Sequence, residues 1–198
     1  AGVEQNAEGK WIDMYYDKNG NKTATPTGDD RQILGNASPK LTVGWNNTLS
    51  YKNWDFSFFF NSAFGGKRLN LVRYTMNSTP GASKFVTDKD YFNNVGKDMP
   101  TLGAGSKVYG NSDKWIENAT YVRLENLSVA YTLPKSMTKF ADLRISVSGQ
   151  NLFTITKYKG IDPAGNSFHS GGGNANAGID MGTYPNPRTF TFGVRATF

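Results

Sequence analysis

The sequence predicts an all-β fold in which five antiparallel strands form the C-terminal part of a large transmembrane β-barrel. Apolar and polar residues alternate along five segments. The length of each is about that expected of a tilted membrane-crossing strand, roughly 9–11 residues. No run approaches the roughly 18 consecutive apolar residues that a membrane-spanning helix needs. Short turns also alternate with long polar connections, as they do at the two rims of a membrane barrel.

The first two segments, 39–51 and 54–64, are joined by Lys52 and Asn53 and are expected to form a tight hairpin. In both segments, bulky apolar residues occupy alternate positions, and mainly small or polar residues lie between them. Successive side chains of a strand face opposite sides of the sheet, so one face is expected to be apolar and to contact hydrocarbon. The expected apolar residues of this hairpin are Leu41, Val43, Trp45, Leu49, Tyr51, Trp54, Phe56, Phe58 and Phe60.

The other three segments, 119–133, 141–156 and 187–198, alternate in the same way, and a short link at 134–140 joins the first two of them. Their polar positions are mostly small or hydroxylated, which suits a water-filled interior better than the Lys- and Glu-rich face of a soluble sheet. Arg144 and Arg195 are expected to point into this interior. The expected apolar residues are Leu127, Val129, Tyr131, Leu133, Leu143, Ile145, Val147, Phe153, Ile155, Phe190, Phe192, Val194, Ala196 and Phe198.

The long polar connections 1–38, 65–118 and 157–186 are expected to be extracellular loops, and the short turns are expected to lie at the periplasmic rim. Tyr51, Trp54 and Tyr131 then fall at the periplasmic interface, where an aromatic belt is expected. Five strands cannot close a membrane barrel, because the smallest barrels need about eight and an open edge leaves backbone groups unpaired in lipid. The rest of the wall is therefore expected from a longer polypeptide or from a second chain.

Composition excludes some classes of site. The chain of 198 residues has no cysteine, so it has neither a disulfide nor a thiolate metal site. The net charge of +6 comes from scattered basic residues, which does not indicate a nucleic-acid surface. The aromatic content of 14% fits a membrane barrel, but it also fits the core of a secreted, soluble β-sandwich that binds carbohydrate. In that alternative the apolar stripes are buried against a second sheet.

Seven short motifs follow one another between residues 33 and 198. They are Ile33–Gly44, Leu49–Ser57, Tyr121–Leu127, Tyr131–Pro134, Gly149–Thr154, Tyr158–Pro163 and Tyr184–Phe190. In this order, and with a terminal Phe198, they resemble motifs of the SusC/RagA family of TonB-dependent outer-membrane transporters.

The resemblance implies a plugged barrel of about 22 strands in the outer membrane of a Gram-negative-type cell, of which this chain supplies the last five. It also implies a SusD-like surface lipoprotein as a lid, energy drawn from TonB, and uptake of glycans (oligosaccharides) or peptides. The plug domain and the TonB box are expected in sequence that this chain lacks. The expected partners are therefore the remainder of the barrel and plug, the lid, TonB and outer-membrane lipid.

Candidate contacts with substrate or lid are aromatic and acidic residues of the long connections. They are Tyr91, Trp115, Tyr158, Asp162 and Phe168. The alternative for the aromatic residues is that they pack the loops against one another. Phe198, at the end of an alternating strand, resembles the assembly signal of outer-membrane barrels; the alternative is an ordinary last strand that ends on an aromatic residue.

No catalytic pattern is present, so the chain is not expected to be an enzyme and no cofactor is expected. The only histidine, His169, is expected in an exposed loop. Asp17, Asn19 and Asn21 begin like a calcium loop, but the sixth and twelfth positions are Lys22 and Gly28 rather than Gly and Glu. A hairpin turn is therefore the preferred interpretation, with weak calcium binding as the alternative.

Overall fold

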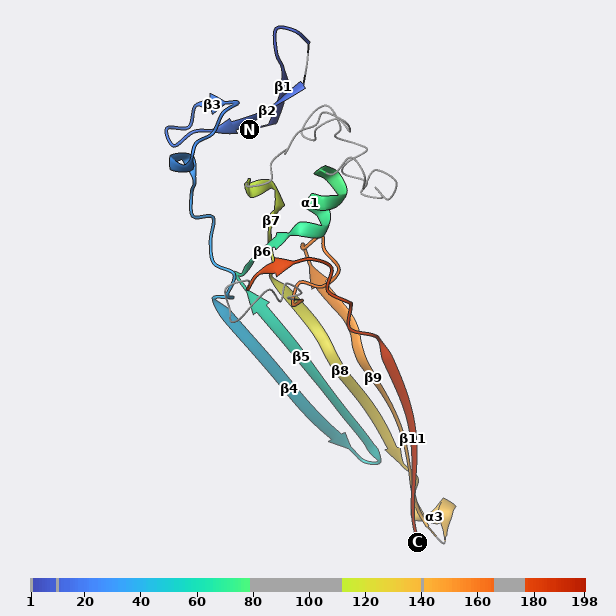
Figure 1. Cartoon of the computed structure of the whole chain (residues 1–198). Coiled ribbons are helices and arrows are strands. Elements are labelled where there is room, and N and C mark those ends of the chain that lie inside the picture. The colour runs from blue at the N-terminus through green and yellow to red at the C-terminus, as the bar shows by residue number, and fades with distance from the viewer. Residues whose placement is uncertain (1, 10, 79–111, 140, 166–176) are drawn as a thin grey trace. The chain divides into compact units, whose positions relative to one another are not determined.

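The computed structural model describes residues 2–9, 11–78, 112–139, 141–165 and 177–198 (Figure 1). The chain divides into two compact units. The strand unit comprises 37–67, 118–165 and 183–198, and the loop unit comprises 1–36, 68–117 and 166–182. None of the helices in the described ranges combines the length and the apolar character that crossing a membrane requires.

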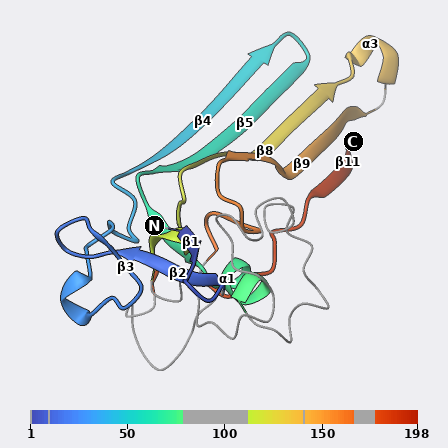
Figure 2. The same cartoon turned by 90° about the horizontal axis from the view of Figure 1, so that it is seen from above.

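The strand unit consists of one antiparallel sheet of five strands in the order β11-β9-β8-β5-β4 (Figures 1 and 2). These strands lie within the five segments of alternating sequence. Strand order follows chain order, so each strand is paired with its neighbours in sequence among the five. The bounds are Leu41–Tyr51 for β4, Trp54–Phe64 for β5, Tyr121–Thr132 for β8, Asp142–Thr156 for β9 and Thr189–Thr197 for β11.

Two short connections lie at one end of this sheet. Lys52 and Asn53 join β4 to β5, and a link with the short helix α3 (Lys135–Thr138) joins β8 to β9. The Thr132 backbone N–H donates to the Asn53 backbone oxygen at 2.8 Å, so the two connections are held side by side. We call this end the short-turn rim.

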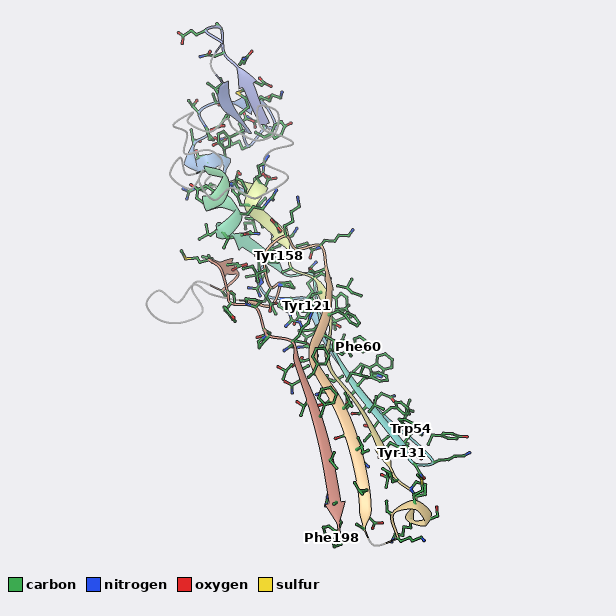
Figure 3. All side chains as sticks on the ribbon, turned by 90° about the vertical axis from the view of Figure 1, so that its right-hand side faces the viewer. Trp54, Phe60, Tyr121, Tyr131, Tyr158 and Phe198 are labelled. Carbon is green, nitrogen blue, oxygen red and sulfur yellow. The ribbon has the colours of Figure 1, made fainter. Side chains whose placement is uncertain are left out.

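The apolar face of the sheet is exposed, as the barrel prediction requires. Register places Trp45 opposite Phe60 and Phe192 opposite Val147, so the apolar residues of neighbouring strands share one face. Figure 3 shows Trp54, Phe60 and Tyr131 on the same side of the sheet. Trp45 is 54% exposed and Phe192 is 78% exposed. The soluble-sandwich alternative is wrong, because it requires these side chains to be buried beneath a second sheet.

Two irregularities interrupt the period of two. The pairing of β5 with β8 shifts between Phe59 and Phe60, and the pairing of β8 with β9 shifts between Leu124 and Asn126. On β9, Asn151 takes a positive φ of 52° within the second irregularity. Asparagine tolerates this left-handed conformation better than most residues, and the pairing of β8 with β9 continues on both sides of it.

The loop unit contains short elements where the sequence indicated only long connections. An antiparallel sheet joins β1 (Gly2–Gln5), β2 (Trp11–Tyr16) and β3 (Lys22–Thr23), and η1 (Gly28–Asp30) follows it. A second small sheet has the order β10-β6-β7. Its strands and the neighbouring helices are β10 (Ile179–Asp180), β6 (Lys67–Asn70), β7 (Ile116–Asn118), α1 (Leu71–Ser78) and η3 (Asp113–Trp115).

Candidate functional site

The candidate site is the five-stranded sheet itself, which has two chemically different faces. On the apolar face, Trp45 packs edge-on against Phe58 with ring centroids 5.2 Å apart, and it stacks on Phe60 at 5.9 Å. Such aromatic contacts stabilise neighbouring strands even where the outer surface of the rings stays exposed. An exposed aromatic surface of this kind is stable against hydrocarbon and unfavourable in water.

The aromatic residues expected at one membrane interface do lie together at the short-turn rim. Trp54 on β5 and Tyr131 on β8 are directly opposite in register, and their ring centroids are 4.7 Å apart. Tyr51, opposite Trp54 on the other side, is 67% exposed. Tyr and Trp have an apolar ring and a polar hydrogen-bonding group, so they suit the level of the lipid headgroups.

The polar face carries an ion pair that crosses a strand. The Ser50 hydroxyl donates to Asp55 at 2.7 Å, and the Arg144 guanidinium donates to the same carboxylate from β9. Ala130 of β8 lies directly opposite Asp55, and its small side chain allows Arg144 to reach across the strand. Arg195 on β11 is opposite Arg144, so two cations share this part of the polar face.

A second ion pair fixes the segment that follows β9. The Arg123 guanidinium donates to Asp162 at 2.6 Å and to the Thr154 hydroxyl at 2.9 Å, and it lies over the Tyr121 ring. The side chains of Arg123 and Asp162 are each only 8% exposed. The Ala164 backbone N–H donates to the same Asp162 oxygen at 2.8 Å, so one oxygen of this carboxylate accepts two hydrogen bonds from within the chain.

Tyr158 packs in the same segment. Its side chain is buried, and its backbone N–H donates to the Thr156 hydroxyl at 3.1 Å. Gly160 lies so close to the Tyr158 ring that an added Cβ would be 2.3 Å from a ring carbon. Tyr158 and Asp162, both expected to contact substrate or lid, are therefore nearly buried in the described structure, and such contact stays a prediction. The Arg123–Asp162 pair holds residues 157–165 against the sheet at the end opposite the short-turn rim.

Trp115 is the buried centre of a separate cluster in the loop unit. Tyr74 lies edge-on to it with centroids 5.8 Å apart, and the Arg73 guanidinium lies over its ring at 5.7 Å. Arg73 also pairs with Glu117 at 3.3 Å, and Asn70 donates to the same carboxylate oxygen. Trp115 is fully buried and packs within the loop unit, and its contact with substrate or lid stays a prediction.

The calcium-like loop is organised by hydrogen bonds. Asp17 Oδ1 accepts the backbone N–H groups of Asn19 and Asn21, each at 2.8 Å. Asp30 accepts the backbone N–H groups of Thr27 and Lys18. The backbone N–H of Asn21 is the main cause of the lowered pKa of Asp17, and that of Thr27 is the main cause of the lowered pKa of Asp30.

This geometry is that of a hairpin turn closed by carboxylates. The N–H donors occupy oxygens that a calcium ion would need, and the described part of the chain contains no group of three His, Cys, Asp or Glu side chains placed to hold a metal. Calcium binding near Asp17, Asn19 and Asn21 stays a prediction that calcium titration can test.

The remaining candidates lie outside the described residues or at the end of the chain. Tyr91, Phe168 and His169 lie outside the described residues. Phe198 lies just beyond β11 and is 92% exposed, and its role as an assembly signal stays a prediction. The amino-acid sequence alone does not reveal the Asp55–Arg144 and Arg123–Asp162 pairs. Opposite charges on the expected polar positions were a signal for the first, whereas the second depends on how residues 157–165 fold back.

Comparison with known proteins identifies relatives along nearly the whole chain, although no protein-family model matches it. It is 37% identical over 194 residues to TonB-dependent receptor P3 of Formosa agariphila. This match covers 94% of this chain and 19% of that protein. It is 29% identical over 191 residues to TonB-dependent receptor SusC of Bacteroides thetaiotaomicron, covering 93% of this chain and 17% of that protein.

Solved structures agree with the sequence relatives. The fold matches a structure of the RagAB peptide transporter with a TM-score of 0.75 and 25% identity, over 100% of this chain and 22% of that one. The RagAB peptide importer in its "open-open" state gives a TM-score of 0.75 at 24% identity, with the same coverage. The chain spans about a fifth of the length of the curated relatives that it matches.

Proposed function

Because this chain belongs to the SusC/RagA family of TonB-dependent transporters of the outer membrane, we propose that it forms part of the wall of a nutrient importer. The observation that carries the proposal is the contrast between the two faces of its sheet. One face exposes Trp45, Phe192 and their neighbours, and the other carries hydroxyl groups and the Asp55–Arg144 pair. Hydrocarbon outside and water inside a pore favour this contrast, and each strand is long enough to cross a tilted path through the bilayer.

The wall needs further strands to function. β4 and β11 are the two edges of the sheet, and an edge in hydrocarbon leaves backbone N–H and C=O groups without partners. We propose that the remaining four-fifths or so of a SusC-length protein provides the missing strands, the plug and the segment that contacts TonB. This chain then contributes five C-terminal strands and their extracellular loops.

The cargo class we propose is glycan (oligosaccharide) or peptide, captured beneath a SusD-like surface lipoprotein. The name RagAB peptide transporter supports a peptide cargo, and the sequence relationship to SusC supports membership in the same group of importers. In the described structure, the part best suited to bear a lid is residues 157–165. Its backbone is fixed by the Arg123–Asp162 pair, while the Ile161 side chain is 58% exposed.

The wall proposal is tested on the full-length transporter in its native cell. We expect the protein in the outer-membrane fraction, dependent on detergent once extracted, and running faster on gels before heating than after, as folded barrels do. A full-length protein that stays monodisperse in plain buffer would contradict a wall that faces hydrocarbon.

The cargo and lid are tested by uptake and by co-purification. Cells that lack the transporter should lose uptake of labelled peptides or of labelled oligosaccharides, and the class that is lost identifies the cargo. Ile161→Asp should reduce co-purification of the lid lipoprotein, because it places a charge on the exposed apolar surface of the fixed loop. Met137→Asp, an equally drastic change at a residue that is 71% exposed on the short-turn rim, is the matched control. Equal co-purification of both variants would remove this loop from the lid contact.

A further inference from the structure

Lys52 occupies an unusual backbone position at the short-turn rim. Its φ is 53°, in the left-handed region that favours Gly, Asn and Asp in two-residue hairpins. Asn53 follows it, so a sequence better suited to the turn would exchange lysine for a second asparagine or a glycine. A side chain in an unfavourable backbone conformation at an exposed turn indicates a use for that side chain beyond the turn.

The Lys52 ammonium is directed toward the apolar face. Its nitrogen lies over the Tyr51 ring, 5.3 Å from the centroid. Tyr51 is 67% exposed and Trp54, directly opposite it, is 43% exposed, both on the apolar face of the sheet. A cation is therefore held at the margin of an exposed aromatic surface, the place where lysines reach the headgroup level of a bilayer.

No carboxylate of the described structure balances this charge. The nearest acid in sequence, Asp55, lies on the polar face and is engaged by Ser50 and Arg144. The adjoining connection adds a further cation, because Thr132 is hydrogen-bonded to Asn53 and Lys135 follows three residues later. Lys135 is 85% exposed, and its contact with Asp142 is long, at 3.6 Å.

From this arrangement we infer that Lys52, Tyr51 and Trp54 form a binding site for the headgroup of an anionic phospholipid in the leaflet that borders the short-turn rim. The ammonium pairs with the phosphodiester, the partly exposed Trp54 ring lies beside it at the headgroup level, and the acyl chains lie along the apolar face beside Phe56. Charge complementarity and the aromatic surface both favour this occupant over a zwitterionic lipid or an acidic protein. The inference rests on the proposed placement of the sheet in the outer membrane.

The test uses the full-length transporter, purified in mild detergent and incubated with equal amounts of phosphatidylglycerol and phosphatidylcholine. Native mass spectrometry counts the lipids that remain bound. We expect the wild type to retain phosphatidylglycerol preferentially, and Lys52→Asn to lower that retention about fivefold. The variant should be at least as heat-stable as the wild type, because asparagine accepts the left-handed conformation more readily than lysine.

Lys40→Asn is the matched control, since it removes an exposed lysine just before β4, at the end of that strand away from the short-turn rim. Unchanged retention in Lys52→Asn, an equal loss in the control, or no preference of the wild type for phosphatidylglycerol overturns the lipid site while leaving the wall proposal intact. Retention of an acidic polypeptide at Lys52 in place of lipid also overturns it. Failure of the wild-type protein to insert into any membrane overturns the wall proposal and the lipid site together.

Discussion

At the scale of single residues, Arg123 shows how a buried charge is stabilised on the polar face of the sheet. Removing a guanidinium from water is costly unless its hydrogen bonds are replaced. Here Asp162 and the Thr154 hydroxyl replace them, and the Tyr121 ring covers one face of the group. Because Asp162 comes from the segment after β9, the same bonds that stabilise Arg123 also fix that segment.

Asp162→Asn should therefore release residues 157–165. It leaves Arg123 buried without a counter-charge, which costs about 3–5 kcal/mol in comparable buried pairs. Hydrogen exchange of the Ala164 and Gly165 amides in the full-length protein should become about 100-fold faster or more, as local opening replaces the protected state. Uptake of cargo by the Asp162→Asn variant should also fall if residues 157–165 contact the lid.

Asp142→Asn provides the comparison for an exposed pair. Its contact with Lys135 is 3.6 Å long and open to solvent, so its loss should cost less than about 1 kcal/mol. Hydrogen exchange at 157–165 should not change. An equal response to both substitutions would show that the buried pair does not hold the loop.

The loop at Asp17 and Asp30 should lose order in acid. The pKa of each carboxyl is lowered in the folded loop, mainly by backbone N–H donors, so its stabilising contribution is complete above the ordinary value of 3.8. The contribution is lost as the pH falls through the lower pKa of the folded loop. Amide exchange at Asn19 and Asn21, corrected for its intrinsic pH dependence, should show full protection at pH 5 and progressively less as the pH falls below 3.8. Asp17→Asn should lack this protection at every pH, and wild-type protection that does not decrease in acid would exclude this role.

At the scale of the strand, the alternation of side chains decides which substitutions the membrane tolerates. Phe192 and Thr191 are neighbours on β11, but Phe192 lies on the apolar face opposite Val147 and Thr191 lies on the polar face opposite Ser148. The two positions share the same backbone environment, so they differ mainly in what surrounds their side chains.

Phe192→Lys should destabilise the barrel by about 2–4 kcal/mol, the cost of a lysine facing the middle of the bilayer. Thr191→Lys should change stability little, because a lysine there reaches water in the interior. The fraction of heat-modifiable, folded protein in the outer membrane measures both. Equal yields of the two variants would contradict the assignment of the faces.

The irregularity in β8 is an element that the alternation did not predict. Counting in twos from Leu127 back along the strand places Arg123 on the apolar face. The shift in pairing between Leu124 and Asn126 instead puts Arg123 opposite Thr154 and Asn61, on the polar face. A single extra residue thus moves a charge away from hydrocarbon, and nothing in the spacing of apolar residues marks where that residue is inserted.

At the scale of the whole molecule, the open sheet means that the barrel wall forms only when further strands pair with it. Both edges, β4 and β11, must pair before the wall is stable in lipid. Phe198 continues the apolar face of β11 and is almost fully exposed, which suits recognition by an assembly factor better than packing.

Deleting Phe198 should therefore lower the amount of full-length transporter inserted in the outer membrane, while its synthesis is unchanged. The Phe198→Tyr variant should insert as well as the wild type, because it keeps an aromatic ring at the terminus. The measurement is the ratio of folded to total protein in the membrane fraction. Normal insertion of the deletion variant would leave Phe198 as an ordinary terminal residue.

The all-β class, the positions of the five strands and the identity of the apolar face could be predicted from the amino-acid sequence, because they depend on a period of two that is local to each strand. Motifs such as those at 121–127 and 184–190 also indicate the family, and the sequence relatives confirm that family. The folded structure was needed to show that Trp115, Tyr158 and Asp162 are buried, that Arg144 reaches Asp55 across Ala130, and that Lys52 lies over Tyr51. These are contacts between residues on different strands or turns, and they depend on register, on irregularities and on the course of loops, none of which the local alternation encodes.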